Sequence, residues 1–130
     1  MIVVDTSAVV AIVRNEPEAL IFARELKRAD VALISAPTRL EGWIVGRRAR
    51  DRLEAEAFEN ILDWAGVVTV PFDDALLTLA QEAFDRFGRS HGRARLNFGD
   101  CFSYALARQR GLPLLFKGDD FRATDIEAVI

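Results

Sequence analysis

Residues 96–107 read LNFGDCFSYALA and carry the clearest helix signal in the sequence. Their apolar side chains recur at the spacing of one helix face, which predicts a helix. Asn97 and Asp100 stand three residues apart at its start, as in a capping box. A carboxylate in the first turn is also favoured by the positive end of the helix dipole. Helix capping alone therefore accounts for Asp100, and a functional role for it depends on acids elsewhere in the chain.

Length and composition indicate one domain over residues 1–130. Hydrophobic residues make up 51% of the chain, which is enough for a core without disulfides or structural metals. Cys101 is the single cysteine, so an internal disulfide and a cysteine-built zinc site are both excluded. The N-terminal run has no basic leader, and no apolar run reaches the length of a membrane span. We expect a soluble, cytoplasmic protein with no membrane association.

Short apolar runs alternate with helix patterns along the chain. Predicted strands cover 1–5, 31–35, 67–71 and 112–116, and 126–130 is a candidate edge strand. Helix starts are indicated by residues typical of caps and first turns, and helix ends by glycines. The starts are Ser7, Pro17, Pro37, Asp51 with Glu54, Asp73 and Asn97, and the ends are Gly66, Gly88 and Gly111. This order predicts an α/β fold with a mostly parallel sheet covered by helices on both faces.

Several acids fall where such a sheet binds ligands, beyond the carboxyl ends of its strands. Asp5 ends the first predicted strand, and Asp119 and Asp120 follow the fourth. Asp100 opens a helix that follows another helix and a loop, so its start can return to the same edge. Glu41 lies one turn into the helix that Pro37 opens and borders an inward face, from which its carboxylate either reaches solvent or points into a cleft.

Convergence of these acids would favour a bound cation. Carboxylates at close range repel one another, which raises the pKa of one or more of them, and a divalent cation removes that penalty. Oxygen ligands without histidine or cysteine select Mg²⁺ or Mn²⁺ over zinc, and such a site suits phosphodiester hydrolysis. Thr6 and Ser7 could hold a water or a phosphate oxygen, and Asn97 could orient a carboxylate. Helix capping explains Ser7 and Asn97 equally well.

Four segments together resemble the PIN-domain ribonucleases, and more narrowly the VapC toxins of toxin–antitoxin pairs. They are MIVVDTSAVVAIVRNEPEA, SAPTRLEGWIV, LNFGDCFSYALA and LPLLFKGDDFRATDI. The resemblance implies a three-layer α/β/α fold with a parallel sheet and Mg²⁺- or Mn²⁺-dependent cleavage of single-stranded or structured RNA. It also implies a homodimer and inhibition by a cognate antitoxin that blocks the acidic cleft. By position it implies catalytic roles for Asp5, Glu41, Asp100 and an acid of the KGDD turn. For the turn we expect Asp119, with Asp120 as the alternative, and we expect metal ligation by Asp5, Asp100 and Asp119.

Two clusters of basic residues could flank this acidic site and hold RNA phosphates. The net charge of −3 argues against binding nucleic acid through overall charge, so local cations would have to do so. The first choice is the loop that leads into Asn97, and the second is the end of the helix that carries Glu41. The candidates are Arg86, Arg89, Arg93 and Arg95 in the first group, and Arg47 and Arg48 in the second. We assign no base role to His91, and we expect Asp125 to be a surface or turn residue.

Two other functions fit parts of the sequence. Asp5 could be the nucleophile of an aspartyl-phosphate phosphatase, but such enzymes usually place a second Asp two residues later, where this chain has Ser7. A PIN-like module could also hold RNA or a protein without cutting, although the presence of all the acids disfavours it. We therefore favour the ribonuclease.

Overall fold

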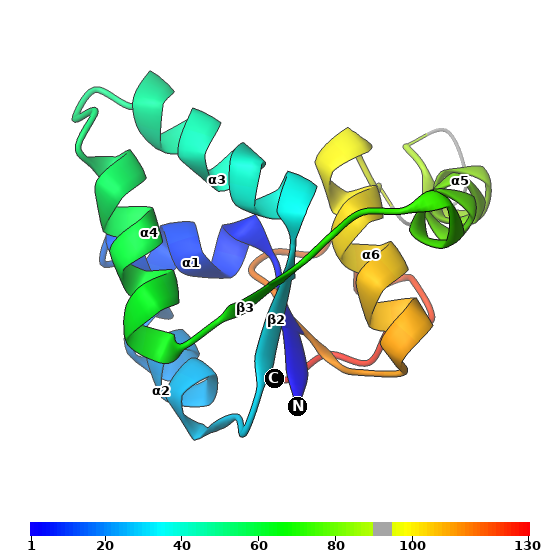
Figure 1. Ribbon diagram of the computed structural model, residues 1–130, viewed down its shortest axis with the longest axis horizontal. Helices are drawn as coiled ribbons and strands as arrows, with labels where there is room; N and C mark the ends of the chain where they lie inside the picture. Colours follow the sequence, from blue (N-terminus) through cyan, green and yellow to red (C-terminus); the bar gives the residue numbers. More distant parts are fainter. Residues whose placement is uncertain (90–94) are drawn as a thin grey trace.

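The computed structural model describes residues 1–89 and 95–130, in which helices and short strands alternate (Figure 1). The elements are β1 (Ile2–Val4), α1 (Thr6–Val13), α2 (Ala19–Arg28), β2 (Ala32–Ser35), α3 (Ala36–Arg48), α4 (Glu54–Ala65), β3 (Val68–Val70), α5 (Asp74–Phe87), α6 (Phe98–Arg110) and β4 (Leu114–Leu115). Within these described ranges, no helix combines the length and the apolar character needed to cross a membrane.

The strands form one parallel sheet in the order β3-β2-β1-β4. Val3 of β1 pairs with Leu33 on one side and with Leu114 on the other. All strands run in the same direction, so their carboxyl ends lie at one edge of the sheet. The expected α/β class is confirmed. The tail adds a single parallel bridge, between Leu114 and Ala128, in place of the expected edge strand.

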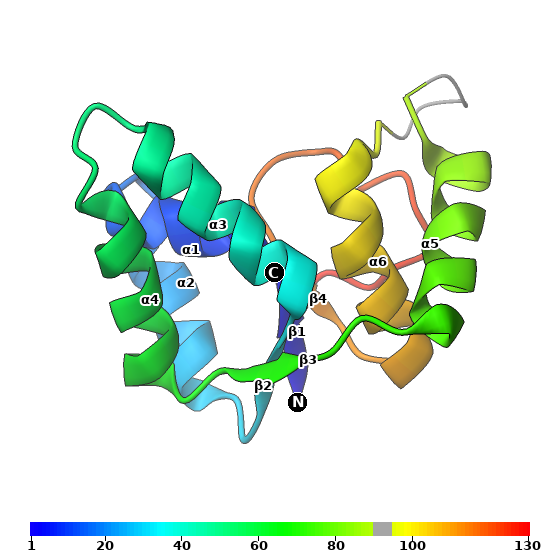
Figure 2. The same cartoon turned by 45° about the horizontal axis from the view of Figure 1, so that its top comes forward.

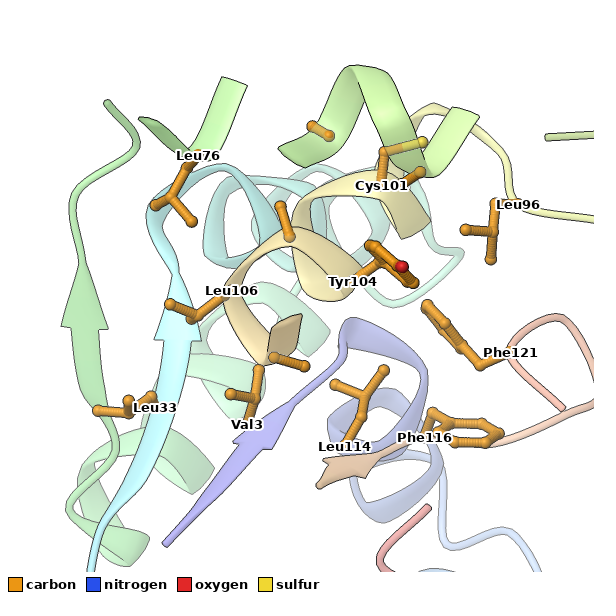
Figure 3. Packing of buried hydrophobic residues seen from close by; sticks show 14 of the residues in the cluster. Val3, Leu33, Leu76, Leu96, Cys101, Tyr104, Leu106, Leu114, Phe116 and Phe121 are labelled. Carbon is orange, nitrogen blue, oxygen red and sulfur yellow. The ribbon is translucent and has the colours of Figure 1, made fainter. Parts of the chain in front are cut away.

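Both faces of the sheet are buried under helices, so the chain has three layers. Ile2 and Val4 of β1 pack with α1, α2 and α4, whereas Val3 packs with α5 and α6. Figure 2 shows these two groups of helices on opposite sides of the sheet. In Figure 3, Val3 and Leu114 lie on the side that α6 covers. Burial on two faces explains why β1 and β4, whose residues are all buried, are wholly apolar.

Helix α3 carries Glu41 and lies against both helical layers. It packs along α4, and it also contacts α6 on the other side of the sheet (Figures 1 and 2). The contact with α4 is close, since a Cβ on Gly46 would lie 2.4 Å from the backbone nitrogen of Ala55. This backbone contact holds α3 in place and with it the position of Glu41.

Two predicted helix caps differ from those in the structure. Asp5, and not Ser7, caps α1, because its carboxylate accepts a hydrogen bond from the Ser7 amide. The capping box predicted at Asp51 and Glu54 is absent, because α4 begins after Leu53 without a side-chain cap and the Glu54 carboxylate pairs with Arg14 at 3.0 Å. The Asp51 carboxylate accepts the Leu53 amide at 3.0 Å instead, so only the pairing of Glu54 with Arg14 is a long-range contact.

Other predicted helix ends are confirmed. Asp73 caps α5 by accepting from the Leu76 amide at 3.0 Å. Gly66 and Gly111 end α4 and α6 at φ values of 66° and 62°, which glycine adopts more readily than other residues.

Candidate active site

Asp5 lies at the carboxyl end of β1 and is 4% exposed. Its Oδ2 accepts hydrogen bonds from the Ser7 amide at 3.1 Å and from the Ser7 hydroxyl at 2.7 Å. Its Oδ1 accepts from the Ser103 hydroxyl at 2.6 Å. The carboxylate is therefore held on both oxygens, from its own helix on one side and from α6 on the other.

Asp100 completes the capping box predicted at the start of α6. The Asp100 amide donates to Asn97 Oδ1 at 2.9 Å, and the Asn97 amide donates to Asp100 Oδ2 at 3.0 Å. Burial, followed by the charges of Asp5, Asp120 and Glu41, raises the pKa of Asp100 to about 7, against the opposing effect of the Asn97 hydrogen bond. Asp100 is thus a helix cap and also one of a group of interacting carboxylates.

Glu41 reaches this group from α3. A Cβ on Gly99 would lie 1.9 Å from Glu41 Oε2, so the carboxylate touches the first turn of α6 beside Asp100. Burial raises the pKa of Glu41, the Asp5 charge raises it further, and the Thr6 hydroxyl opposes the rise. Three segments remote in sequence therefore bring Asp5, Glu41 and Asp100 close enough for their charges to interact.

The KGDD turn brings a fourth carboxylate near the group. Asp119 and Asp120 are both exposed, and Asp120 is the one whose charge raises the pKa of Asp100. The backbone carbonyl of Asp119 accepts the Arg122 amide at 3.0 Å and closes the turn. The turn is tied to Asp5 through the Lys117 amide, which donates to the Ser7 hydroxyl at 3.0 Å.

Two buried hydroxyls that the sequence analysis did not select connect the elements of the site. Ser103 follows Asp100 by one helical turn, Thr38 precedes Glu41 by one turn, and their hydroxyl oxygens are 3.3 Å apart. The single hydroxyl hydrogen of Ser103 is donated to Asp5, so Thr38 must donate to Ser103. Thr6 donates in turn to the Thr38 carbonyl at 3.0 Å. Each of these two residues is polar, lies one helical turn from a candidate acid, and belongs to a helix face that is otherwise apolar. That pattern could have identified them from the sequence.

The donor chemistry of the site fits a hard divalent cation. Within the described residues no group of three or more His, Cys, Asp or Glu side chains could hold a metal ion as placed. Mg²⁺ does not need such a cage, because it binds through one or two carboxylates and keeps several waters. Burial, together with repulsion from neighbouring carboxylates, raises the pKa of Asp100, and a bound cation would favour its ionised form.

The arginines expected to bind RNA differ in what they already contact. Arg86 pairs with Asp125 at 3.5 Å and stacks on Phe87, and Arg47 pairs with Glu56. Arg48 is exposed and lines a groove that also contains Glu41. Arg89 and Arg95 border the segment 90–94, and Arg93 and His91 lie outside the described residues.

Asp125 lies at the surface, as expected, but it also has a structural role. It accepts a hydrogen bond from the Tyr104 hydroxyl at 2.7 Å and pairs with Arg86 and Arg108. These contacts join the C-terminal segment to α5 and α6.

Comparison with known proteins identifies the family of this chain. The model of the PIN domain family matches residues 2–127. The chain therefore belongs to the PIN domain family, as the sequence motifs predicted.

Its relatives within that family are VapC ribonucleases. The chain is 43% identical over 129 residues to Ribonuclease VapC28 of Mycobacterium tuberculosis, covering 98% of this chain and 97% of the relative. It is 41% identical over 127 residues to Ribonuclease VapC of Mycolicibacterium smegmatis, covering 98% of each.

Solved structures share the fold at lower identity. The crystal structure of VapC20 from Mycobacterium tuberculosis, titled a Sarcin-Ricin loop cleaving toxin, superposes with a TM-score of 0.80 at 23% identity, over 99% of this chain and 98% of that one. FitAcB from Neisseria gonorrhoeae superposes with a TM-score of 0.67 at 19% identity, over 98% of this chain and 96% of that one.

Proposed function

We propose that this chain is the endoribonuclease toxin of a toxin–antitoxin pair and hydrolyses RNA phosphodiesters with the help of Mg²⁺ or Mn²⁺. The observation that carries the proposal is the meeting of Asp5, Glu41 and Asp100, contributed by β1, α3 and α6, in a chain whose relatives are VapC ribonucleases. The same relatives favour phosphodiester hydrolysis over the aspartyl-phosphate chemistry that Asp5 alone would allow.

Each acid has a distinct environment and therefore a distinct proposed task. Asp5 and Asp100 would hold the cation. For the acid of the KGDD turn we now favour Asp120 over the Asp119 expected from the sequence, because the charge of Asp120 raises the pKa of Asp100. When bound, Mg²⁺ or Mn²⁺ would polarise a phosphoryl oxygen and lower the pKa of an attacking water. Ser7 and Ser103 fix the orientation of Asp5. Burial raises the pKa of Glu41, so its carboxylate is a stronger base, suited to accept the proton of the attacking water.

The test is RNA cleavage with Mg²⁺ by the Asp5→Asn and Asp100→Asn variants. Each substitution removes a charge but keeps an oxygen that can accept the capping hydrogen bond. We expect each variant to fold, by circular dichroism, and to lose about 100-fold or more of its cleavage rate. Asp73→Asn is the matched control, because Asp73 caps α5 without belonging to the site. Cleavage at the parent rate by both site variants would refute the proposed function.

A second copy of the chain and an antitoxin are the proposed protein partners, in the cytoplasm. A groove of about 580 Å³ between α5 and α6 has apolar walls that include Leu77, Ala80 and Phe102. Leu77 is 44% exposed, and apolar surface of this kind favours burial against a partner. We assign the groove to the second copy. Light scattering should give about twice the 14.5 kDa of one chain, and Leu77→Asp should give the monomer mass.

A further inference from the structure

The KGDD turn, which carries Asp120, is anchored at its two ends by buried aromatic rings. Phe116 precedes the turn and Phe121 follows it, and their rings lie 5.0 Å apart between centroids (Figure 3). Gly118, Asp119 and Asp120 are exposed between them, and Gly118 has a φ of 96°, a conformation that favours glycine. The position of Asp120 therefore depends on what holds the residues between the two rings.

Lys117, the first residue of this turn, contacts the rest of the protein through its backbone and through its side chain. Its amide donates to the Ser7 hydroxyl at 3.0 Å, and that hydroxyl donates to Asp5. Its ammonium group pairs with Glu16 and, at 3.3 Å, with Glu18. One residue thus joins the turn both to a proposed metal ligand and to the loop between α1 and α2.

The local sequence fixes the backbone from which Glu16 makes this contact. Helix α1 ends in a Schellman motif, in which the Asn15 amide donates to the Ile12 carbonyl at 3.1 Å and the Glu16 amide donates to the Ala11 carbonyl at 2.9 Å. Asn15 has the left-handed conformation that this motif requires, with a φ of 50°. Because Pro17 also restricts the backbone of the residue before it, the Glu16 carboxylate projects from a defined position.

The charges of the site give this ion pair a purpose. The negative charge of Asp120 acts on Asp100, as does that of Asp5. Like charges repel, so in the absence of a cation the exposed turn is pushed away from the other acids. The attraction between Lys117 and the two glutamates fixes the start of the turn against this displacement.

We propose that Lys117, held by Glu16 and Glu18, is a positioning residue that keeps Asp120 beside the other acids before the cation binds. This inference rests on the proposed ribonuclease function and adds to it the contact that arranges the metal-free site. A site that is already arranged binds its ion more tightly, because less ordering is needed on binding. Lys117 itself would touch neither the ion nor the RNA.

The first measurement is Mn²⁺ affinity by calorimetric titration. Lys117→Met keeps the length of the side chain and the backbone amide but removes the charge, and it should weaken Mn²⁺ binding by about 3- to 10-fold. This lies at the low end of the effect of losing a support behind a metal ligand, because the pair is partly exposed and screened by solvent. Lys117→Arg keeps the charge and should stay within about 2-fold of the parent.

Hydrogen exchange in EDTA reports on the turn in the metal-free protein. The hydrogen-bonded amides of Lys117 and Arg122 should exchange about 3- to 10-fold faster in Lys117→Met. Arg14→Met is the matched control, because it removes a similarly exposed ion pair, with Glu54, from the end of α1. It should change neither the exchange of these amides nor the Mn²⁺ affinity.

A double-mutant cycle tests whether Lys117 acts through the glutamates. In a background that carries Glu16→Gln and Glu18→Gln, adding Lys117→Met should cause no further loss of Mn²⁺ affinity. Additive losses would overturn the inference, because Lys117 would then act without its two partners.

Unchanged Mn²⁺ affinity in Lys117→Met would also overturn the inference. If that variant then bound RNA more weakly by fluorescence anisotropy, Lys117 would be a phosphate contact instead. Either failure, combined with loss of cleavage in Asp5→Asn, would remove the positioning role of Lys117 and leave the ribonuclease proposal standing.

Discussion

The Ser103 hydroxyl donates a 2.6 Å hydrogen bond to Asp5 Oδ1 and so joins α6 to the end of β1 across 98 residues of sequence. Ser103 is 1% exposed, and Thr38, which must donate to it, is fully buried. Hydrogen bonds to charged groups in such surroundings are short and strong. We therefore interpret Ser103 as a positioning residue that fixes the orientation of the Asp5 carboxylate, a proposed ligand of the cation.

Ser103→Ala should lower cleavage and metal affinity by about 10- to 100-fold, as loss of the support behind a metal ligand does elsewhere. Stability should also fall, by about 1–3 kcal/mol, because the partner of a buried polar group is removed. The measurements are cleavage at increasing Mg²⁺ concentration, calorimetric titration with Mn²⁺, and urea unfolding. Much of the lost activity should return at high Mg²⁺.

The Mg²⁺ concentration that Ser103→Ala needs for cleavage distinguishes a positioning role of Ser103 from a role in packing alone. Thr78→Ala removes a hydroxyl that donates to the backbone carbonyl of Asp74 within α5 at 3.3 Å, and it should change neither metal affinity nor cleavage. If Ser103→Ala lost stability but kept the parent Mg²⁺ requirement, Ser103 would be structural only.

Gly99→Ala should reduce activity without reducing stability. The added Cβ would lie 1.9 Å from Glu41 Oε2, so the carboxylate must move, and a displacement of about 1 Å in a catalytic group can cost about 100-fold in rate. The obstacle is the end of a flexible side chain, and alanine is favoured over glycine within a helix by about 0.5–1 kcal/mol. Thermal unfolding and RNA cleavage measured on the same preparation test both expectations.

A double-mutant cycle assigns the effect of Gly99→Ala to Glu41. In a Glu41→Ala background the obstructed carboxylate is absent, so adding Gly99→Ala should cause no further loss of cleavage. Additive losses would show that the substitution disturbs α6 itself.

The sequence was sufficient for the fold class and for most element positions. Alternating apolar runs and helix patterns predicted the parallel sheet, and Asp73, Asn97, Gly66 and Gly111 were identified correctly as helix ends. The cap of α1 was assigned wrongly because DTS offers two residues able to cap, and the choice of Asp5 depends on its distance from the Ser7 amide. Local composition does not contain that distance.

Part of the candidate site could also be predicted from the sequence. In a parallel sheet, ligands bind beyond the carboxyl ends of the strands, and this rule predicted that Asp5 and the KGDD turn lie at the same edge. The sequence did not predict the roles of Ser103, Thr38 and Gly99, because these roles arise from contacts between elements far apart in the chain. In a sequence pattern they resemble ordinary small residues on helix faces.

Asp120 and Asp119 provide a matched pair of substitutions. Adjacent residues in a turn point in different directions, and the charge of Asp120 is the one that raises the pKa of Asp100. Asp120→Asn should therefore lower cleavage by about 10-fold or more and lower the pKa of Asp100, followed by carboxyl ¹³C NMR. Asp119→Asn should stay within about 2-fold of the parent rate, or about 0.4 kcal/mol, because Asp119 is not among the charges that raise the pKa of Asp100. The reverse order of effects would assign the fourth acid to Asp119.

Asp100 should make the metal-free protein less stable as the pH rises. In the folded chain the pKa of Asp100 is about 7, above its ordinary value of 3.8. Between these values the folded state holds a proton that the unfolded state has released, so this contribution is complete below about pH 4 and lost above about pH 7. One pKa unit is roughly 1.4 kcal/mol, so the loss is a few kcal/mol at most. Urea unfolding in EDTA should show parent stability falling relative to Asp100→Asn across this range, and a pH-independent difference would contradict the raised pKa.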